Sequence, residues 1–556
     1  MIKCIHDTPS QALYTRRCLL FMVDSDIKIT ERKNNYKKDL GLWSVIMLAL
    51  GGILGPAIAY APVYTLAYAG PVGVLAWPIS MVMIIPIGLV FAELGTSWPK
   101  AGGVAYYPSK SNGPIVGAIN GWSSMVGYLF VGPVIVFAAV EYLSFYYPPL
   151  YVNGVLSYLG ILIAEMILVL VFLVNVLRIR HMGAINVILT IVTVILVGVV
   201  IGALFLFFKP SNFTSSAVGG FTPYGFTGLF GAITLTVFGY GGFRQPVDYA
   251  EEVKNPGRSI PIAIIVSLLV SGLIFSLESL AFAGAVNFSK FDISSGSWSS
   301  FFSYSSPYAT ISQTLVMPAI VVIAIVVALI ATFKDGVIYY GGTARVGEIL
   351  AREDKFLPRI FERMNVRGIP IYSIILVLVI TIVLVALGRS LATIIGIMVD
   401  GFLLSYAPGS ISLMVFRKTD TKTKRPFKLP FANVLAPIAF VVSNLLVFWS
   451  GWTAVEIIIP LDFAGILLVV VHNHYTKLDV KYALYGIWMP IYLIFILFMS
   501  YIGSSFFGGS NIIPFPYDSL VFIIVTLIFY VLGVNLGVKS VNYINKKNTE
   551  KPAESS

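Results

Sequence analysis

Charged residues, cysteine and histidine are all scarce in this sequence of 556 residues. Only 11% of the residues are charged, whereas a soluble protein is closer to a quarter charged, and 57% are hydrophobic. These proportions exclude an ordinary soluble domain and indicate a protein that lies in a lipid bilayer. The only two cysteines, Cys4 and Cys18, lie in the N-terminal tail, so there is no disulfide framework. With four histidines and scattered carboxylates, we expect no enzymatic activity, no metal site and no cofactor.

We also expect no signal peptide in this sequence. Its first apolar run, residues 18–23, is too short for the core of such a peptide and has no small-residue cleavage site. Met22 precedes an ordinary polar tail, so we hypothesise that translation starts there; N-terminal sequencing that finds earlier residues would contradict this. We expect residues 1–40, or 22–40 if translation starts at Met22, to form a cytoplasmic N-terminal tail.

Apolar sequence of membrane-spanning length is abundant, at about 20 residues per segment. Fourteen such segments fall at about residues 41–67, 72–95, 115–146, 155–176, 185–208, 226–245, 260–286, 315–340, 371–387, 391–416, 431–450, 453–471, 483–502 and 520–538. The pattern predicts an all-α polytopic membrane protein, with the lipid bilayer as its surroundings.

Basic residues are distributed very unevenly between alternate loops. If the N-terminal tail is cytoplasmic, the loops on the other side of the membrane hold only Lys209, Lys290 and Arg389. This asymmetry satisfies the positive-inside rule and predicts a multi-pass protein of the cell membrane with both termini in the cytoplasm. The net charge of +11 is dispersed over all the cytoplasmic loops, and we therefore expect no nucleic-acid partner.

Two of the apolar segments contain helix-breaking residues at membrane depth. The first reads Leu50-Gly-Gly-Ile-Leu-Gly-Pro-Ala-Ile58, and the sixth reads Phe238-Gly-Tyr-Gly-Gly-Phe-Arg-Gln-Pro246. A broken helix is tolerated there only where it is buried in protein or lines a cavity. Breaks five helices apart favour an inverted repeat with its binding site between the repeats. The alternative is that the glycines merely permit close helix packing.

Longer motifs lie beside these breaks. They are Ala250-Glu-Glu-Val-Lys-Asn-Pro-Gly-Arg-Ser-Ile-Pro261, Ala92-Glu-Leu-Gly-Thr-Ser-Trp-Pro-Lys-Ala-Gly-Gly103, Gly121-Trp122, Ala344-Arg-Val-Gly-Glu-Ile-Leu-Ala-Arg-Glu-Asp-Lys-Phe-Leu-Pro358 and Gly368-Ile-Pro370. Over about the first 420 residues, the chain resembles the amino acid–polyamine–organocation transporter superfamily.

The resemblance implies a leucine-transporter-like fold, in which ten core helices form two inverted repeats of five and work by alternating access. Residues 41–208 would form the first repeat and residues 226–417 the second. Residues 430–540 would form four peripheral helices, and residues 541–556 a C-terminal cytoplasmic tail. The expected partner is an amino-acid-like small molecule, bound by a monomer or a homodimer.

The resemblance also implies a substrate site at the two breaks. Free N–H groups at a helix N-terminus suit a carboxylate, and unwound carbonyls suit an ammonium or a cation. Pro56 has no N–H, so carboxylate binding would rest on fewer donors, such as Ala57 and Ile58. The candidate substrate-binding residues are Ile53, Gly55, Pro56, Ala57, Ile58, Phe238, Tyr240, Gly241, Gly242, Arg244 and Gly336.

Charge within a membrane span is costly and is by default a functional candidate. Such charges occur at Arg244, Lys334, Asp335 and Asp400, which we predict to form a coupling or charge network. Lys334 and Asp335 diverge by about 100° on a helix and each needs its own partner. The pair could instead fix helix register as a structural network.

Arg244 has two interpretations. It could favour a substrate with extra negative charge, or it could be neutralised by Asp335 or Asp248 and never meet the substrate. Three alternatives for coupling stay open, namely H+, Na+ or no coupling ion. Some proton-coupled relatives have a fifth-helix lysine in place of sodium, and the corresponding position here is about Thr193, so Lys334 is a candidate substitute.

Glu93, Glu251 and Glu252 are predicted to form a cytoplasmic gate with basic residues such as Arg345. Together these features predict a secondary active transporter of an amino acid, or of a related small amine or organic ion, across the plasma membrane. The alternatives are a polyamine or organic-acid carrier or exchanger of the same fold, a channel or sensor, and a membrane-embedded enzyme.

Overall fold

The computed structural model describes residues 36–550 apart from 153, 292–293 and 388–390. Predictions about the rest of the N-terminal tail, Met22 and the two cysteines lie outside these residues. The chain is almost entirely helical, which confirms the predicted fold class. Within the described part of the chain, the only strands are β1 (Tyr151–Val152) and β2 (Val155–Leu156), which form a short antiparallel pair.

The helices follow the predicted segments. Twelve helical runs among the described residues are long and apolar enough to cross a membrane. Two shorter apolar helices, α2 and α15, lie within the first and ninth predicted segments. The membrane-length and shorter apolar helices are α2 (Leu42–Ile53), α3 (Ala57–Ala69), α4 (Ala76–Ser97), α6 (Pro114–Leu143), α7 (Tyr158–Asn175), α8 (Ile179–Phe205), α10 (Gly225–Tyr240), α12 (Pro256–Ala285), α14 (Pro318–Arg352), α15 (Ile371–Ala386), α16 (Leu391–Thr419), α17 (Ala432–Ser450), α18 (Trp452–Phe463), α19 (Leu467–Thr476), α21 (Trp488–Ile502) and α22 (Tyr517–Glu550).

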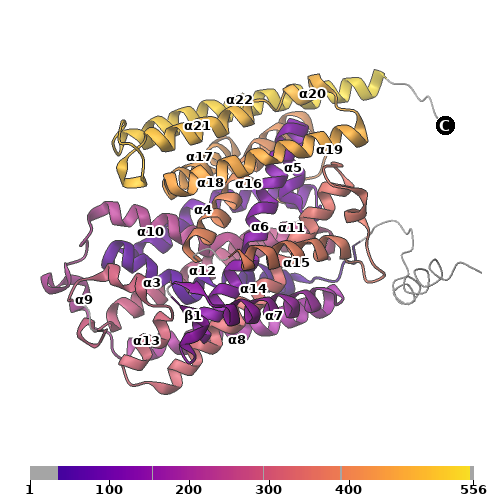
Figure 1. The fold of residues 1–556 in the computed structure, drawn as a ribbon. Helices are drawn as coiled ribbons and strands as arrows, with labels where there is room; N and C mark the ends of the chain where they lie inside the picture. Colours follow the sequence, from indigo (N-terminus) through magenta and orange to yellow (C-terminus); the bar gives the residue numbers. More distant parts are fainter. Residues whose placement is uncertain (1–35, 153, 292–293, 388–390, 551–556) are drawn as a thin grey trace, which may run out of the picture.

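Short helices connect these elements. They are α5 (Gly103–Asn112), α9 (Ser211–Thr214), η4 (Gly241–Arg244), α11 (Gln245–Asp248), η5 (Ala250–Glu252), η7 (Trp298–Ser303), α13 (Pro307–Thr314) and α20 (Val480–Leu484). In Figure 1, α9 and α13 lie at one end of the bundle and the C-terminus of α22 lies at the other. We call the end that carries Lys100, Lys110 and Arg345 the basic face, and the end with α9 and α13 the opposite face.

Both predicted breaks are present, and they contact each other. The first apolar segment splits into α2 and α3 on either side of residues 54–56, and the sixth changes at Gly241 from α-helix to the 3-10 turn η4. A Cβ added to Gly242 would collide with the backbone of Gly52 and Ile53. Glycine is therefore required at position 242, because the two unwound backbones approach more closely than any side chain allows.

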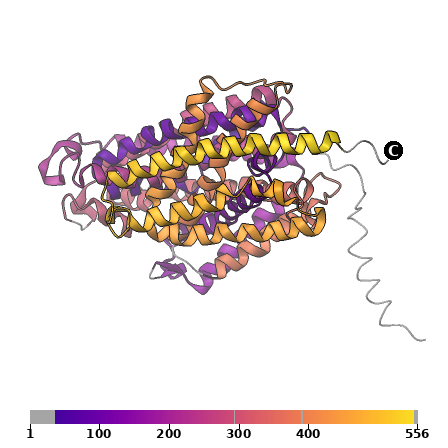
Figure 2. The same ribbon diagram turned by 90° about the horizontal axis from the view of Figure 1, so that it is seen from above.

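The core packs around these breaks. Helix α6 contacts α14 and α16, while α12 lies along α2 and α4. Helices α17 to α22 cover one flank of the core, and α22 runs along that flank in Figure 2. It continues as a helix to Glu550, so residues 541–550, which the sequence pattern assigned to a tail, extend this last helix.

Candidate functional site

The C-terminal end of α2 is capped by a lysine from α14. The Nζ atom of Lys334 donates to the carbonyl oxygens of Gly51, at 2.7 Å, and Leu54, at 2.6 Å. The last carbonyls of a helix have no partner within it and carry the negative end of its dipole. The lysine is buried. The groups that accept hydrogen bonds from its ammonium are backbone oxygens rather than a carboxylate.

Asp335, the next residue, faces Gly55 on the α3 side of the same break. A Cβ added to Gly55 would collide with its carboxyl group. The Oδ1 atom of Asp335 has no hydrogen-bond partner among the described residues, and the side chain is only 4% exposed. Lys334 and Asp335 thus lie on the two sides of one break, and of the two only Lys334 has hydrogen-bond partners among the described residues.

A small pocket lies between this break and three neighbouring helices, α6, α14 and α16. Four of the predicted substrate residues line it, namely Ile53, Gly55, Pro56 and Ala57. Asp335 lines it as well. The remaining walls, which the sequence did not indicate, are Gly52, Val131, Val134, Tyr339, Met398 and Phe402 from α2, α6, α14 and α16. Nothing local marks these residues, because whether a side chain faces the break depends on how its helix is rotated.

The second break takes part in the contacts between the two breaks through its backbone rather than through side chains. Tyr406 donates to the carbonyl of Gly241 at 3.2 Å, and Tyr339 donates across to Gly52 at 3.2 Å. Phe402 stacks on Tyr339 with ring centroids 5.8 Å apart. These aromatic residues hold the two breaks together from α14 and α16.

Other predicted substrate residues face elsewhere. Tyr240 donates to the carbonyl of Trp77 at 2.9 Å, in an aromatic cluster away from the pocket. A Cβ at Gly336 would meet Ile135 and Val171, so this glycine serves helix packing. Ile58 is buried without lining the pocket. The side chain of Phe238 lies outside the described part of the chain.

Arg244 is fully buried and pairs with Asp248 in the following turn. Its Nε atom lies 2.7 Å from Asp248 Oδ2, and a second nitrogen donates to Ser124 Oγ at 2.7 Å. Its guanidinium also lies 4.2 Å from the ring centre of Tyr128, whose hydroxyl donates to the same Asp248 oxygen. Of the two predicted neutralising partners, the structure therefore selects Asp248 and not Asp335.

Asp400 is separate from these charges. Its Oδ2 atom accepts a hydrogen bond of 2.7 Å from Ser450 at the end of α17. The expected single network of Arg244, Lys334, Asp335 and Asp400 is thus three separate arrangements in the described structure. Asp400 faces the peripheral helices because the α16 face that carries it is turned toward α17 and α18.

Ion pairs close the basic face. Arg345 forms a bidentate pair with Glu252, at 2.6 and 2.8 Å, and lies 3.8 Å from the ring centre of Tyr249. Burial is the largest influence on the Glu252 carboxyl and raises its pKa despite this arginine. The segment before α2 is tied to the same turn, because Leu40 donates to the carbonyl of Glu252 at 3.0 Å.

The other two predicted gate carboxylates take different partners. Glu251 pairs with Arg352 at 2.6 Å. Glu93 contacts Arg417 and Arg425 and accepts a bond of 2.7 Å from the Leu429 amide. Each of the three carboxylates thus contacts an arginine. Arg345 is the partner of Glu252, whereas Glu93 on α4 faces Arg417 and the loop after α16.

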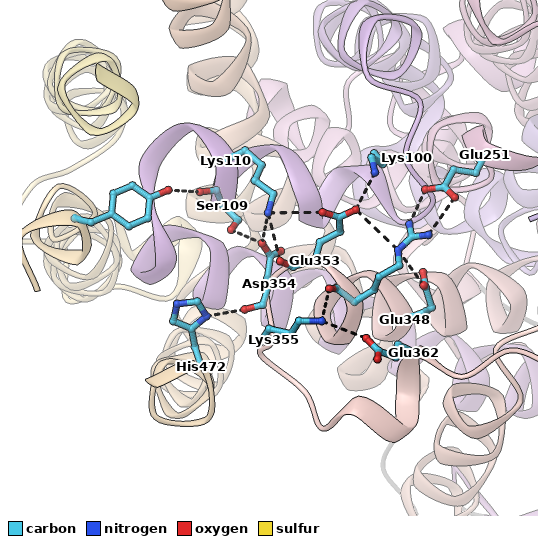
Figure 3. Close-up of polar contacts among 12 residues, drawn as sticks. Lys100, Ser109, Lys110, Glu251, Glu348, Glu353, Asp354, Lys355, Glu362 and His472 are labelled. Carbon is cyan, nitrogen blue, oxygen red and sulfur yellow. Dashed lines mark hydrogen bonds and ion pairs between the residues drawn. The ribbon is translucent and has the colours of Figure 1, made fainter. Parts of the chain in front are cut away.

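A second layer of polar contacts at this face was missed by the sequence analysis (Figure 3). Lys100 pairs with Glu353 at 2.8 Å, and Lys110 pairs with Asp354 at 3.1 Å. The Nδ1 atom of His472 lies 2.6 Å from the carbonyl oxygen of Asp354. These contacts join α5 and the peripheral helix α19 to the end of α14. Among the described residues, no group of three or more potential metal ligands occurs.

The comparisons with known proteins identify the family. Residues 40–470 match the amino acid permease family. The chain belongs to this family. It is 31% identical over 525 residues to the glutamate/serine transporter AimA of Bacillus subtilis (strain 168), covering 91% of this chain and 95% of that protein. It is 30% identical over 509 residues to the aspartate-proton symporter of the same organism, covering 90% and 96%.

A more distant relative is the probable threonine/serine transporter YbxG of Bacillus subtilis (strain 168), at 26% identity over 78% of this chain and 94% of that protein. The amino acid permease family confirms the resemblance drawn from the motifs. It also confirms the predicted function, which is secondary transport of an amino acid or a related small molecule across a membrane.

Proposed function

We propose that this amino acid permease is a proton-coupled symporter of the cell membrane whose substrate binds between the two helix breaks. The single observation that carries the proposal is the position of Lys334, whose ammonium group donates hydrogen bonds to the carbonyl oxygens of Gly51 and Leu54. Transporters with broken helices bind a sodium ion through carbonyl oxygens of the unwound backbone. A fixed ammonium at such a place removes the need for sodium.

Asp335 supplies the group that would take up the proton. Its carboxyl lies against Gly55, beside the N-terminus of α3, which attracts carboxylates through its free N–H groups and dipole. An ionised Asp335 would compete with a substrate carboxylate for this position, and a protonated Asp335 would not. Substrate and proton would therefore bind together, which is the thermodynamic requirement for symport.

Few other charges bear on this carboxyl. Lys334 is its neighbour on α14, and Tyr339 lies one turn further along the same helix. The pocket residues that face it from α2, α3, α6 and α16 are all apolar or glycine. The affinity of Asp335 for a proton would thus depend on burial and on Lys334.

The first candidate substrates are glutamate, aspartate and serine, because two relatives of this chain are named for them. Proton uptake by Asp335 suits an acidic substrate, since it removes one negative charge from a site that receives two carboxylates. Arg244 is already paired with Asp248, which supports a structural role for it rather than direct contact with the substrate.

The orientation follows from the charge pattern. With the basic face in the cytoplasm, both described ends of the chain are cytoplasmic, as the positive-inside rule requires. The pairs Glu252–Arg345, Glu251–Arg352 and Glu93–Arg417 then form a closed cytoplasmic gate. Alternating access would require these pairs to separate.

Uptake into proteoliposomes tests the proposal. We expect an inward proton gradient to drive accumulation of at least one of glutamate, aspartate and serine, and a protonophore to abolish it. Replacing sodium with potassium should change nothing. Asp335→Asn should lose gradient-driven accumulation yet keep substrate counterflow, because an amide cannot exchange a proton. Accumulation that requires a sodium gradient would contradict the proposal.

A further inference from the structure

A second and larger cavity opens on the opposite face, away from the pocket between the breaks. Its volume is about 610 Å³, within the range of small-molecule sites in proteins. Its walls come from the outer parts of α3 and α10, from the start of α16, from α17 and α18, and from the turn η7. The helix breaks and the pocket at Gly55 contribute none of its lining residues.

One wall of this cavity carries a buried carboxylate that lacks a counter-ion. Asp400 is 0% exposed, and only its Oδ2 atom is bonded, to Ser450. Its Oδ1 atom has no hydrogen-bond partner among the described residues, and no described lysine or arginine forms an ion pair with it. An uncompensated carboxylate within a membrane protein is costly, and a positively charged ligand beside it would offset that cost.

The same cavity has an aromatic wall. Phe302 of η7 lies between two tyrosines of α3, with ring centroids 5.4 Å from Tyr64 and 4.8 Å from Tyr68. Tyr68 and Phe302 are 46% and 42% exposed, so their faces are open to a ligand. Aromatic faces attract ammonium groups through the ring quadrupole, and they also cover the apolar body of such a ligand.

We propose that this cavity is a second ligand site that binds an organic cation, an ammonium group attached to an apolar body. The ammonium would lie toward Asp400, and the apolar part against Tyr64, Tyr68 and Phe302. The described lining contains no lysine or arginine to hold a carboxylate, which favours an amine over an amino acid. The site is independent of the proton-coupling proposal, because neither Lys334 nor Asp335 lines it.

Occupation of the site should inhibit transport. Helix α3 follows the first break and α10 precedes the second, whereas α17 and α18 belong to the peripheral flank. A ligand wedged between these two groups of helices would oppose their relative movement. Because the substrate pocket is elsewhere, the inhibitor should lower the maximal rate of uptake and leave the apparent KM for substrate unchanged.

Thermal unfolding of the purified protein tests binding. We expect 2-phenylethylamine to raise the unfolding temperature of the wild type, and 2-phenylethanol, its neutral analogue, to have no such effect. Asp400→Asn should weaken amine binding about tenfold or more. Glu278→Gln is the matched control, because it neutralises another buried carboxylate that does not line the cavity, and it should keep the amine response.

A second variant keeps the test decisive if Asp400→Asn does not fold. Ala454→Leu fills the cavity from α18 while leaving Asp400 in place, and it should also lose the amine response. Equal stabilisation by the alcohol and the amine would overturn the proposal, because it would identify an apolar crevice. Equal loss in Asp400→Asn and Glu278→Gln, or no loss in Ala454→Leu, would overturn it as well.

Inhibition is measured with benzyltrimethylammonium, a permanent cation that does not cross membranes or dissipate a proton gradient. Added on the opposite face, it should reduce the maximal rate of amino acid uptake in the wild type and in Glu278→Gln, and not in Ala454→Leu. Purely competitive inhibition would overturn the proposal, because it would locate the cation at the substrate pocket instead.

Discussion

Lys334 and Asp335 are adjacent in sequence and act on opposite sides of one helix break. The ammonium of Lys334 binds the carbonyl oxygens at the end of α2, while the carboxyl of Asp335 faces Gly55 before the start of α3. The pair places an ammonium group at the negative end of one half-helix and a carboxyl group near the positive end of the next. Both placements follow the direction of the helix dipoles.

The role of Lys334 as a built-in cation can be tested by removing it. In Lys334→Ala the carbonyls of Gly51 and Leu54 lose their donor, so we expect a loss of stability of about 1–3 kcal/mol and no accumulation of substrate. The vacated oxygens should then accept a metal cation. Sodium should raise the unfolding temperature of this variant and leave the wild type unchanged, and equal responses of the two proteins would count against the idea.

Gly55→Ala tests the close contact between Asp335 and the break. The added methyl group would collide with the Asp335 carboxyl, so we expect substrate binding to be lost or strongly weakened. Gly41→Ala is the matched control, because a Cβ at that position meets nothing within 4 Å. Substrate-induced shifts of the unfolding temperature provide the measurement. Equal behaviour of both variants would show that the contact does not matter for binding.

Arg244→Gln distinguishes a structural arginine from a substrate-binding one. Because Asp248 would be left buried and unpaired, we expect a loss of about 3–5 kcal/mol of stability. The double variant Arg244→Gln/Asp248→Asn should recover part of it. In that double variant the preference between glutamate and serine should match the wild type. Selective loss of glutamate uptake would instead show that Arg244 meets the substrate.

The Glu252–Arg345 pair should hold the basic face closed. Arg345→Gln removes both of its ionic contacts with Glu252, so the adjoining bond from the Leu40 amide should open more often. Hydrogen exchange of residues 36–41 should accelerate, and uptake should fall. Arg359→Gln, on the exposed turn after α14, serves as the control and should exchange like the wild type. Unchanged exchange in Arg345→Gln would argue against the pair as a gate.

A pH prediction follows from the outer layer of the basic face. Burial raises the pKa of Glu353, but the ammonium groups of Lys100 and Lys110 outweigh it and lower the pKa below its usual value. A carboxyl with a lowered pKa stabilises the fold above its unfolded pKa, and the contribution is lost as the pH falls through the folded value. The Lys100→Gln variant should therefore unfold at a lower temperature than the wild type at neutral pH. The two unfolding temperatures should converge in acid.

Local patterns determined the membrane spans and the positions of the breaks. A span is recognised from the length of its apolar run, and the breaks from glycines and prolines, such as Gly55 and Pro56, that act on their own backbone. The motif that ends at Pro261 was sufficient to indicate the family. These features depend on neighbouring residues, so they could be predicted without knowing how the helices pack.

The partners of the charges were decided only by the tertiary structure. Lys334 reaches carbonyls that are 280 or more residues away in sequence, and Asp400 faces Ser450 on a peripheral helix. Tyr339 and Phe402 line the pocket at the first break without any sequence signal. The reason is physical: a sequence gives each helix its apolar length, whereas packing sets the rotation of that helix about its axis, and this rotation determines which side chains meet.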